Sequence, residues 1–149
     1  MFLSKTCIYG ILAVLYVATK ENKKYLPISF IADELGISFH FLTKILQKLT
    51  QQNIMASYRG PNGGIALARP AEEVKLIDIV VAIDGSGLFD RCVLKLSGCG
   101  TLKPCPLHDE WQGIRGQIQE MLEHTTVAAM AQKVIENSLR LSDVDPLDL

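Results

Sequence analysis

The feature that most constrains the fold is a helical pattern, a glycine turn and a second helical pattern, followed directly by a glycine-rich hairpin. Residues 28–38 favour a short helix, a tight turn and the start of a second helix over residues 39–51. Gly36 suits the left-handed conformation that ends a helix, and Ser38 is placed to cap the next one. Two helices joined in this way predict a helix-turn-helix.

The second predicted helix has an apolar and a polar face. Its apolar face consists of Phe39, Leu42, Ile45, Leu46 and Leu49. Its polar face consists of His40, Thr43, Lys44, Gln47 and Lys48. A helix of this length fits the major groove of DNA. Two helices that only pack together would show the same pattern, so the next segment matters.

That next segment predicts a hairpin. Residues 54–58 and 65–68 favour strands, and they are joined by Arg59-Gly60-Pro61-Asn62-Gly63-Gly64, whose tip is nearly bare of side chains. A hairpin directly after a helix-turn-helix is the wing of a winged helix. Its tip can approach a sugar-phosphate backbone, and Arg59 can reach a phosphate or a narrow minor groove. We therefore predict that the chain binds double-stranded DNA.

The charge distribution agrees with this prediction. Residues 1–70 carry eight Lys and Arg against three Asp and Glu, whereas residues 71–149 carry seven against thirteen. The basic half contains the predicted winged helix, where a polyanion would bind.

An apolar run at residues 7–18 precedes the helix-turn-helix. Ser4 is placed to cap a helix over this run to about Lys20, apolar on nearly every side and therefore buried, in part by a second subunit. The run is too short to span a membrane, which takes about 20 residues. It resembles a secretory signal, but the DNA-binding pattern places the chain in the cytoplasm, where cysteines stay reduced. Cys7 is expected to be a small core residue.

Helical spacing continues in the second half of the chain. Residues 76–84 predict a short helix that Gly85 ends. A longer helix up to His124 carries a sparse apolar stripe of Trp111, Ile114, Ile118, Met121 and Leu122. Such a helix commonly pairs with its twin, so we predict a homodimer. Thr125 or Thr126 can cap a last helix to about Leu139, before an acidic tail.

These elements predict a mainly α fold with a small β-hairpin wing: a winged helix-turn-helix plus a long C-terminal dimerisation helix. Residues 1–84 would form the DNA-binding domain with a linking helix, and residues 85–110 a cysteine-rich loop. Residues 111–149 would form the dimerisation helix, the final helix and the tail. With 149 residues, 48% of them apolar, the chain can bury one ordinary core or a small domain plus an extension.

The cysteine-rich loop is the candidate metal site. Cys92, Cys99 and Cys105 lie within fourteen residues, and His108 follows three positions later. The chain lacks the repeated C-x-x-C pairs of most structural zinc ribbons. Spacing of this wider kind suits an iron-sulfur cluster. Zinc, or thiol-disulfide sensing without a metal, remain the alternatives.

Wing and cysteine loop together resemble the IscR-like family of dimeric bacterial winged-helix regulators, which includes iron-sulfur, nitric-oxide and iron-responsive members. The resemblance spans nearly the whole chain and implies a cluster loop between the winged helix and the dimerisation helix. It implies that Cys92, Cys99, Cys105 and His108 bind a 2Fe-2S cluster. The spacing between the first two cysteines is one residue longer than in that branch, which leaves a 4Fe-4S cluster open. Some nitric-oxide-responsive members use an acidic ligand early in the first helix, where this chain has Cys7 and Ile8.

The same resemblance assigns DNA contacts. Residues at the family's contact positions are Ser38, His40, Phe41, Thr43 and Lys44. Lys48 and Arg59 add phosphate contacts, and the wing supplies Gly60, Pro61, Gly63 and Gly64. No carboxylate lies among the helix positions, unlike the best-known regulator, so the operator sequence cannot be inherited from it.

We therefore predict a DNA-binding transcriptional repressor whose affinity for a pseudo-palindromic operator is controlled by an iron-sulfur cluster that senses iron, redox or nitric oxide status. The alternatives are a thiol or zinc sensor, a redox or electron-transfer protein, and a winged helix that binds a protein partner. No nucleotide loop, nucleophile-base pair or carboxylate dyad supports an enzyme.

Overall fold

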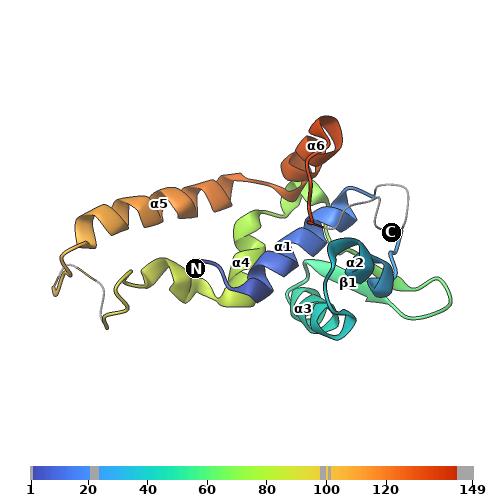
Figure 1. The fold of residues 1–149 in the computed structure, drawn as a ribbon, viewed down its shortest axis with the longest axis horizontal. Coiled ribbons are helices and arrows are strands. Elements are labelled where there is room, and N and C mark those ends of the chain that lie inside the picture. The colour runs from blue at the N-terminus through green and yellow to red at the C-terminus, as the bar shows by residue number, and fades with distance from the viewer. Residues whose placement is uncertain (1, 21–23, 98–99, 101, 144–149) are drawn as a thin grey trace.

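A single apolar helix, α1 (Lys5–Ala18), is the element on which most of the others pack. The computed structural model describes residues 2–20, 24–97, 100 and 102–143 (Figure 1). Helix α1 contacts α3 (Phe39–Gln51), α4 (Leu76–Asp84) and α6 (Val127–Asn137). Its buried residues are Cys7, Gly10, Ala13, Val14, Leu15, Tyr16 and Val17. Their spread around the helix confirms that α1 is buried on several sides.

The ends of α1 are fixed by side-chain hydrogen bonds. As predicted, Ser4 caps the helix, and its hydroxyl accepts a bond of 3.0 Å from the backbone N–H of Cys7. The helix ends at Ala18, earlier than the predicted Lys20. Thr19 forms the C-cap, and its hydroxyl donates to the Tyr16 carbonyl of the last turn at 2.6 Å.

Helices α2 (Ile28–Leu35) and α3 form the predicted helix-turn-helix. Gly36 is left-handed, with φ 63° and ψ 33°, and the N–H of Ile37 bonds to the carbonyl of Ala32 at 2.9 Å. The predicted side-chain cap at Ser38 is wrong. Its hydroxyl makes no capping bond, and its carbonyl instead accepts the N–H of Leu42 at 2.9 Å.

Strands β1 (Met55–Tyr58) and β2 (Gly64–Leu67) form the predicted antiparallel hairpin. Strand β1 begins one residue later than predicted, and β2 begins and ends one residue earlier. Leu26, in the loop before α2, adds a bridge to the free edge of β2. Its N–H and carbonyl exchange bonds of 2.9 and 2.8 Å with Ile65. The hairpin is thereby attached to the helix-turn-helix at a point distant in sequence.

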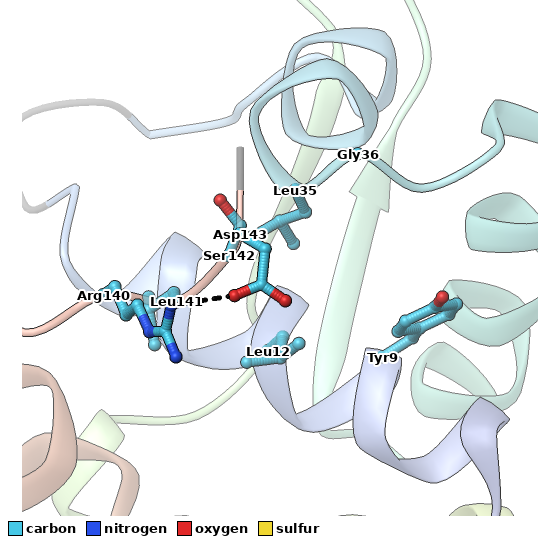
Figure 2. A pocket seen from close by; sticks show the side chains of 8 residues that line it. All are labelled: Tyr9, Leu12, Leu35, Gly36, Arg140, Leu141, Ser142 and Asp143. Carbon is cyan, nitrogen blue, oxygen red and sulfur yellow. Dashed lines mark ion pairs between the residues drawn. The ribbon is translucent and has the colours of Figure 1, made fainter. Parts of the chain in front are cut away.

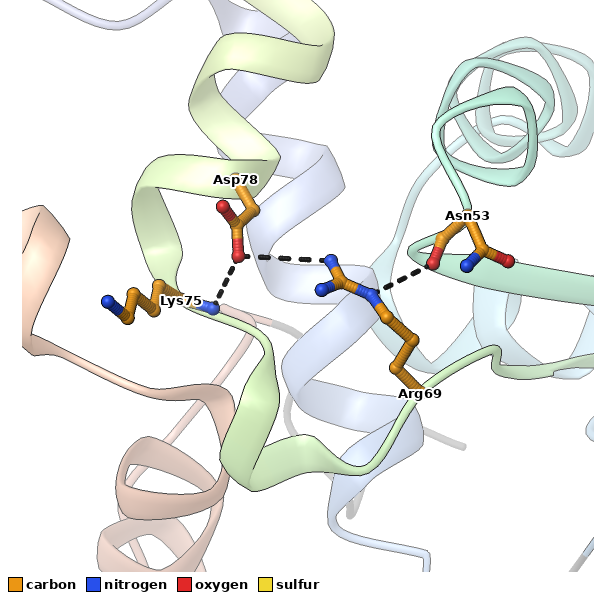
Figure 3. A network of polar contacts seen from close by, with 4 residues as sticks. All are labelled: Asn53, Arg69, Lys75 and Asp78. Carbon is orange, nitrogen blue, oxygen red and sulfur yellow. Dashed lines mark hydrogen bonds and ion pairs between the residues drawn. The ribbon is translucent and has the colours of Figure 1, made fainter.

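A polar network holds the chain after the hairpin (Figure 3). The Arg69 Nε donates to the carbonyl of Asn53 at 3.1 Å, and its Nη2 lies 3.8 Å from the Asp78 carboxylate. The same carboxylate accepts the N–H of Lys75 at 2.9 Å and so caps α4. Because Asn53 follows α3, the network joins the end of the second helix to the start of α4.

The C-terminal half begins with the 3-10 turn η1 (Ala71–Glu73), then α4 and a second turn, η2 (Ser86–Asp90). Helix α5 (His108–His124) extends away from the winged helix (Figure 1). It starts three residues earlier than the stripe from Trp111 indicated, and Asp109 and Glu110 in its first turn favour that start.

The junction between α5 and α6 is attached to the start of α4. Leu76 donates its N–H to the Thr125 carbonyl at 2.9 Å, and Val127 donates to Val74 at 2.8 Å. Helix α6 is capped by Thr126, one of the two predicted residues, and ends at Asn137 rather than near Leu139. No helix in the described part of the chain is long and apolar enough to cross a membrane.

The Leu26–Ile65 bridge requires glycine at position 64. A Cβ there would lie 2.0 Å from the carbonyl oxygen of Leu26. We expect Gly64→Ala to lower the free energy of unfolding by about 2–3 kcal/mol, since the backbones would have to separate. Gly87→Ala is the control, because no atom lies within 4 Å of its added Cβ. If urea denaturation showed the same loss of unfolding free energy for Gly64→Ala and Gly87→Ala, this explanation would be wrong.

Candidate nucleic-acid interface and cysteine site

Helix α3 presents an exposed polar strip. His40, Lys44 and Lys48 are exposed and follow one another at intervals of four residues, so they lie along one side of the helix. Ser38 is exposed at the start of the helix. Thr43 is half-buried, and its hydroxyl donates to the Phe39 carbonyl at 2.8 Å. The strip carries two lysines and no carboxylate, which suits a polyanion.

The two aromatic residues of α3 are arranged differently from the sequence pattern. Phe39 was placed on the apolar face, but 47% of it is exposed and its ring lies 5.7 Å from that of His40. Phe41 is half-buried, and its ring meets Tyr9 of α1 edge-on at 5.7 Å. The apolar-face prediction for Phe39 is therefore wrong. A DNA contact by Phe41 stays a prediction. The same ring packs against α1.

The wing tip is closed by its own backbone. The N–H of Gly63 donates to the carbonyl of Gly60 at 3.0 Å, and a Cβ at Gly63 would lie 2.3 Å from the Tyr58 carbonyl oxygen. Arg59, Gly60 and Pro61 are exposed. Close backbone contacts therefore explain why positions 63 and 64 are glycines, whether or not these residues also contact DNA.

A tyrosine pair beside the wing was not predicted. The rings of Tyr25 and Tyr58 stack with centroids 5.4 Å apart and an interplanar angle of 29°. With Lys24 and Asn62 they line a cavity of about 500 Å³. The sequence signal was present, because Lys24 precedes one tyrosine and Arg59 follows the other, but only folding brings the two segments together.

The cysteine loop brings two predicted ligands into contact. The Sγ atoms of Cys92 and Cys105 are 3.5 Å apart. This is longer than the roughly 2.05 Å of a disulfide bond. Cys92 is buried and Cys105 half-buried, whereas Cys99 lies outside the described residues. His108 is buried at the start of α5, and its backbone N–H donates to the Cys105 carbonyl at 3.0 Å.

Within residues 2–20, 24–97, 100 and 102–143, no three Cys, His, Asp or Glu side chains form a group that could hold a metal ion. The structure therefore brings together the sulfur atoms of Cys92 and Cys105. It bonds the His108 backbone N–H to the Cys105 carbonyl, and the described residues do not complete a four-ligand site.

The start of the loop is attached to α5. The carbonyl of Arg91 accepts the indole N–H of Trp111 at 2.8 Å and the Nη1 of Arg115 at 3.1 Å. The Phe2 ring contacts Trp111, with centroids 6.3 Å apart. Cys92 lines a cavity of about 280 Å³ beside these residues. The backbone next to Cys92 is thus coupled to α5 and to the segment before α1.

Cys7 belongs to the hydrophobic core, as predicted. It is completely buried. Burial, together with the nearby Asp84 carboxylate, raises the pKa of the Cys7 thiol to about 12. Asp84 also accepts hydrogen bonds from the backbone N–H and the hydroxyl of Ser4. A buried, protonated thiol is poorly suited to serve as a cluster ligand, because the thiolate is the form that binds metals.

The C-terminal segment returns to the helix-turn-helix. A cavity of about 500 Å³ separates α1 and α2 from residues 140–143 (Figure 2). The Ser142 hydroxyl donates to the Glu34 carbonyl at 3.1 Å, and Arg140 pairs with Asp143 at 3.0 Å. No predicted site residue lines this cavity. The contact at Glu34 lies just before the Gly36 turn that leads into α3.

Comparison with known proteins decides the family. The Rrf2 family model, described as an iron-dependent transcriptional regulator, matches residues 3–133. The chain belongs to the Rrf2 family. The transcriptional regulator IscR of Sodalis glossinidius is 31% identical over 140 residues, which cover 94% of this chain and 82% of the relative. The IscR-like resemblance is confirmed.

Solved structures agree on the fold of this Rrf2-family protein. The oxidized form of Staphylococcus aureus CymR matches with a TM-score of 0.70 and 25% identity, over 89% of this chain and 97% of that chain. IscR from T. potens matches with a TM-score of 0.74 and 22% identity, over 93% and 91%, which shows the fold. The winged helix is confirmed. The relatives are transcriptional regulators rather than enzymes.

If Arg59 contacts a phosphate, Arg59→Ala should reduce the slope of log affinity against log salt by about 0.9, the value for one contact. Fluorescence anisotropy with a mixed-sequence duplex of about 30 base pairs measures this slope. Arg69→Ala is a matched control, since Arg69 is engaged with Asn53 and Asp78. An unchanged slope for Arg59→Ala would remove this residue from the interface.

The raised pKa of Cys7 makes stability depend on pH with a defined sign. An unfolded thiol ionises at about pH 8.5, whereas folded Cys7 stays neutral to about pH 12. Between these values the folded state binds more protons, so its stability should fall as pH rises. Urea denaturation should show a steeper fall in the wild type than in Cys7→Ala. If the stability of the wild type and of Cys7→Ala fell equally with pH, the Cys7 thiol would have the same pKa in the folded and unfolded states.

Proposed function

We propose that this protein is a homodimeric repressor whose operator affinity is controlled by an iron-sulfur cluster, most simply 2Fe-2S, bound by Cys92, Cys99, Cys105 and His108. The observation that carries the proposal is the 3.5 Å separation of the Cys92 and Cys105 sulfurs in a loop attached to α5. The iron-dependent description of the family supports iron as the metal.

The sulfur pair fits a tetrahedral metal centre. Metal-sulfur bonds of about 2.3 Å at the tetrahedral angle hold two sulfurs about 3.8 Å apart. Cys92 and Cys105 are therefore close to the spacing of two ligands on one metal ion. When bound, an iron-sulfur cluster supplies iron-ligand bonds that are sensitive to oxidation state and solvent exposure. A histidine ligand can be protonated or exchanged, which makes release easier than with four thiolates.

The loop can influence α5 through Arg91. Its carbonyl holds both Trp111 and Arg115, so a change in the backbone at Cys92 alters two contacts in the first turns of α5. The Phe2 ring packs against Trp111 and against Phe89 of η2, which extends the same cluster to the segment before α1. Ordering or release of the loop would therefore shift α5 relative to the helices that position α3.

Helix α5 carries a stripe suited to pairing. Apolar residues recur at alternating steps of four and three at Leu107, Trp111, Ile114, Ile118 and Met121. Three of them are about half exposed in the single chain, at 46% for Leu107, 51% for Ile114 and 56% for Met121. This spacing is that of a coiled-coil seam. A second copy of α5 would cover it and relate two α3 helices by a two-fold axis.

Such a dimer should read a pseudo-palindrome. Its two α3 helices would enter major grooves about 34–36 Å apart, or a multiple of this, and its wings would reach the flanking minor grooves. The hydrogen bonds from α5 to the Arg91 carbonyl would then control the distance between the two α3 helices. Operator affinity follows from that separation.

The same sulfur pair favours a second candidate function, thiol sensing. Hydrogen peroxide could oxidise the two thiols, so that an S–S bond forms, the O–O bond breaks and two waters leave. One of the structural neighbours is CymR, the global cysteine regulator of B. subtilis. Zinc, which also accepts paired thiolates, is the metal alternative.

Anaerobic purification separates these functions. We expect a brown protein with equal amounts of iron and sulfide, whose visible spectrum changes in His108→Ala and whose iron is lost in Cys92→Ser. Cys7→Ala is the matched cysteine control and should keep its iron, because Cys7 is buried in the core.

A colourless protein without iron after reconstitution would contradict the cluster. In that case, a reversible disulfide between Cys92 and Cys105 after peroxide treatment, detected by mass spectrometry, would support thiol sensing. Stoichiometric zinc would support the zinc site.

A further inference from the structure

The tyrosine pair beside the wing lies on the outer face of a small sheet. Tyr58 pairs with Gly64 across the hairpin, and Leu26 bridges to Ile65 on the other edge of β2. Leu26 and Ile65 are buried at 1% exposure. Because side chains alternate between faces, Tyr25 and Tyr58 point away from the core.

Small residues make room for the ring stack. Gly64, the partner of Tyr58, has no side chain, and Ala66 follows on the same face of β2. Gly60 lies against the ring as well, since a Cβ there would be 3.3 Å from Tyr58. The Tyr58 ring thus lies against Gly60 of the wing tip, while 54% of the residue remains exposed.

The cavity at this pair has a distinct chemistry. Among the described residues, its lining consists of Lys24, Tyr25, Tyr58 and Asn62, which contribute one ammonium, one carboxamide, two phenols and no carboxylate. Aromatic faces suit the apolar side of a sugar ring. Ammonium, amide and hydroxyl groups are the usual donors to phosphate oxygens in protein–DNA complexes.

We propose that Lys24, Tyr25, Tyr58 and Asn62 form a seat for one deoxyribose-phosphate unit of the DNA backbone next to the wing. The seat is continuous with the wing, because Tyr58 is followed by Arg59 and Asn62 belongs to the tip. It rests on the DNA-binding function and adds residues that the family resemblance did not assign. It binds a phosphate of either strand without reading a base, so it sets the position of the wing.

The test is binding to a mixed-sequence duplex of about 30 base pairs, measured by anisotropy over a range of salt concentrations. We expect Lys24→Gln to reduce the salt slope by about 0.9, as for one lost phosphate contact. Lys133→Gln, an exposed lysine on α6, is the matched control and should keep the slope. We expect Tyr58→Phe, which keeps the ring stack and loses the hydroxyl, to weaken binding about fivefold.

Tyr58→Ala distinguishes the seat from a structural brace. If Tyr58→Ala weakens binding while Tyr58→Phe and Lys24→Gln match the wild type, the pair only supports the wing and the seat is wrong. If Lys24→Gln and Tyr58→Phe have no effect but Arg59→Ala and Lys44→Ala lose affinity, the seat fails and the α3–wing interface stands. If none of these variants changes binding, the interface itself is misplaced.

Discussion

Burial of α1 is the constraint on which the rest of the structure depends. This helix contacts α3, which carries the exposed lysines, and also α4 and α6, which flank α5 in sequence. Its first turn is bonded to Asp84 at the end of α4, and Phe2 before it packs on Trp111 of α5. Because a packed apolar helix transmits displacement rather than absorbing it, α1 offers the proposed switch a route from the cysteine loop to α3.

The two functional regions meet different physical demands. The DNA surface needs exposed cations on a fixed backbone, and the Leu26–Ile65 bridge supplies that backbone by tying the wing to the helix-turn-helix. The cysteine loop needs a backbone that can rearrange, and between η2 and α5 it contains no helix or strand in its described residues. It is held at its start by Arg91 and at its end by the Cys105–His108 backbone bond. A loop anchored at both ends can convert a local change at sulfur into a shift of α5.

The sequence predicted what local chemistry determines. The Gly36 turn, the bounds of α3, the hairpin and the Ser4 cap all depend on residues close together in the chain. The failure at Phe39 involves tertiary packing, because Phe39 lies beyond the core that covers Leu42. The failure at Ser38 is local, since its hydroxyl makes no capping bond although its position is that of a cap. Neither the Tyr25–Tyr58 stack nor the Ser142–Glu34 contact, which spans 108 positions, leaves a periodic signal. The cysteine spacing indicated a shared site, but only the fold brings two sulfurs to 3.5 Å.

The central claim is that the chemical state of the cysteine loop sets DNA affinity. The direct measurement is the dissociation constant for an operator selected in vitro with this protein, determined anaerobically for iron-loaded and iron-free samples. Our account predicts that the two wild-type constants differ by about tenfold or more, equivalent to about 1.4 kcal/mol of coupling. It also predicts that Cys92→Ser gives a single value under both conditions. Equal constants for the loaded and empty wild type would contradict it.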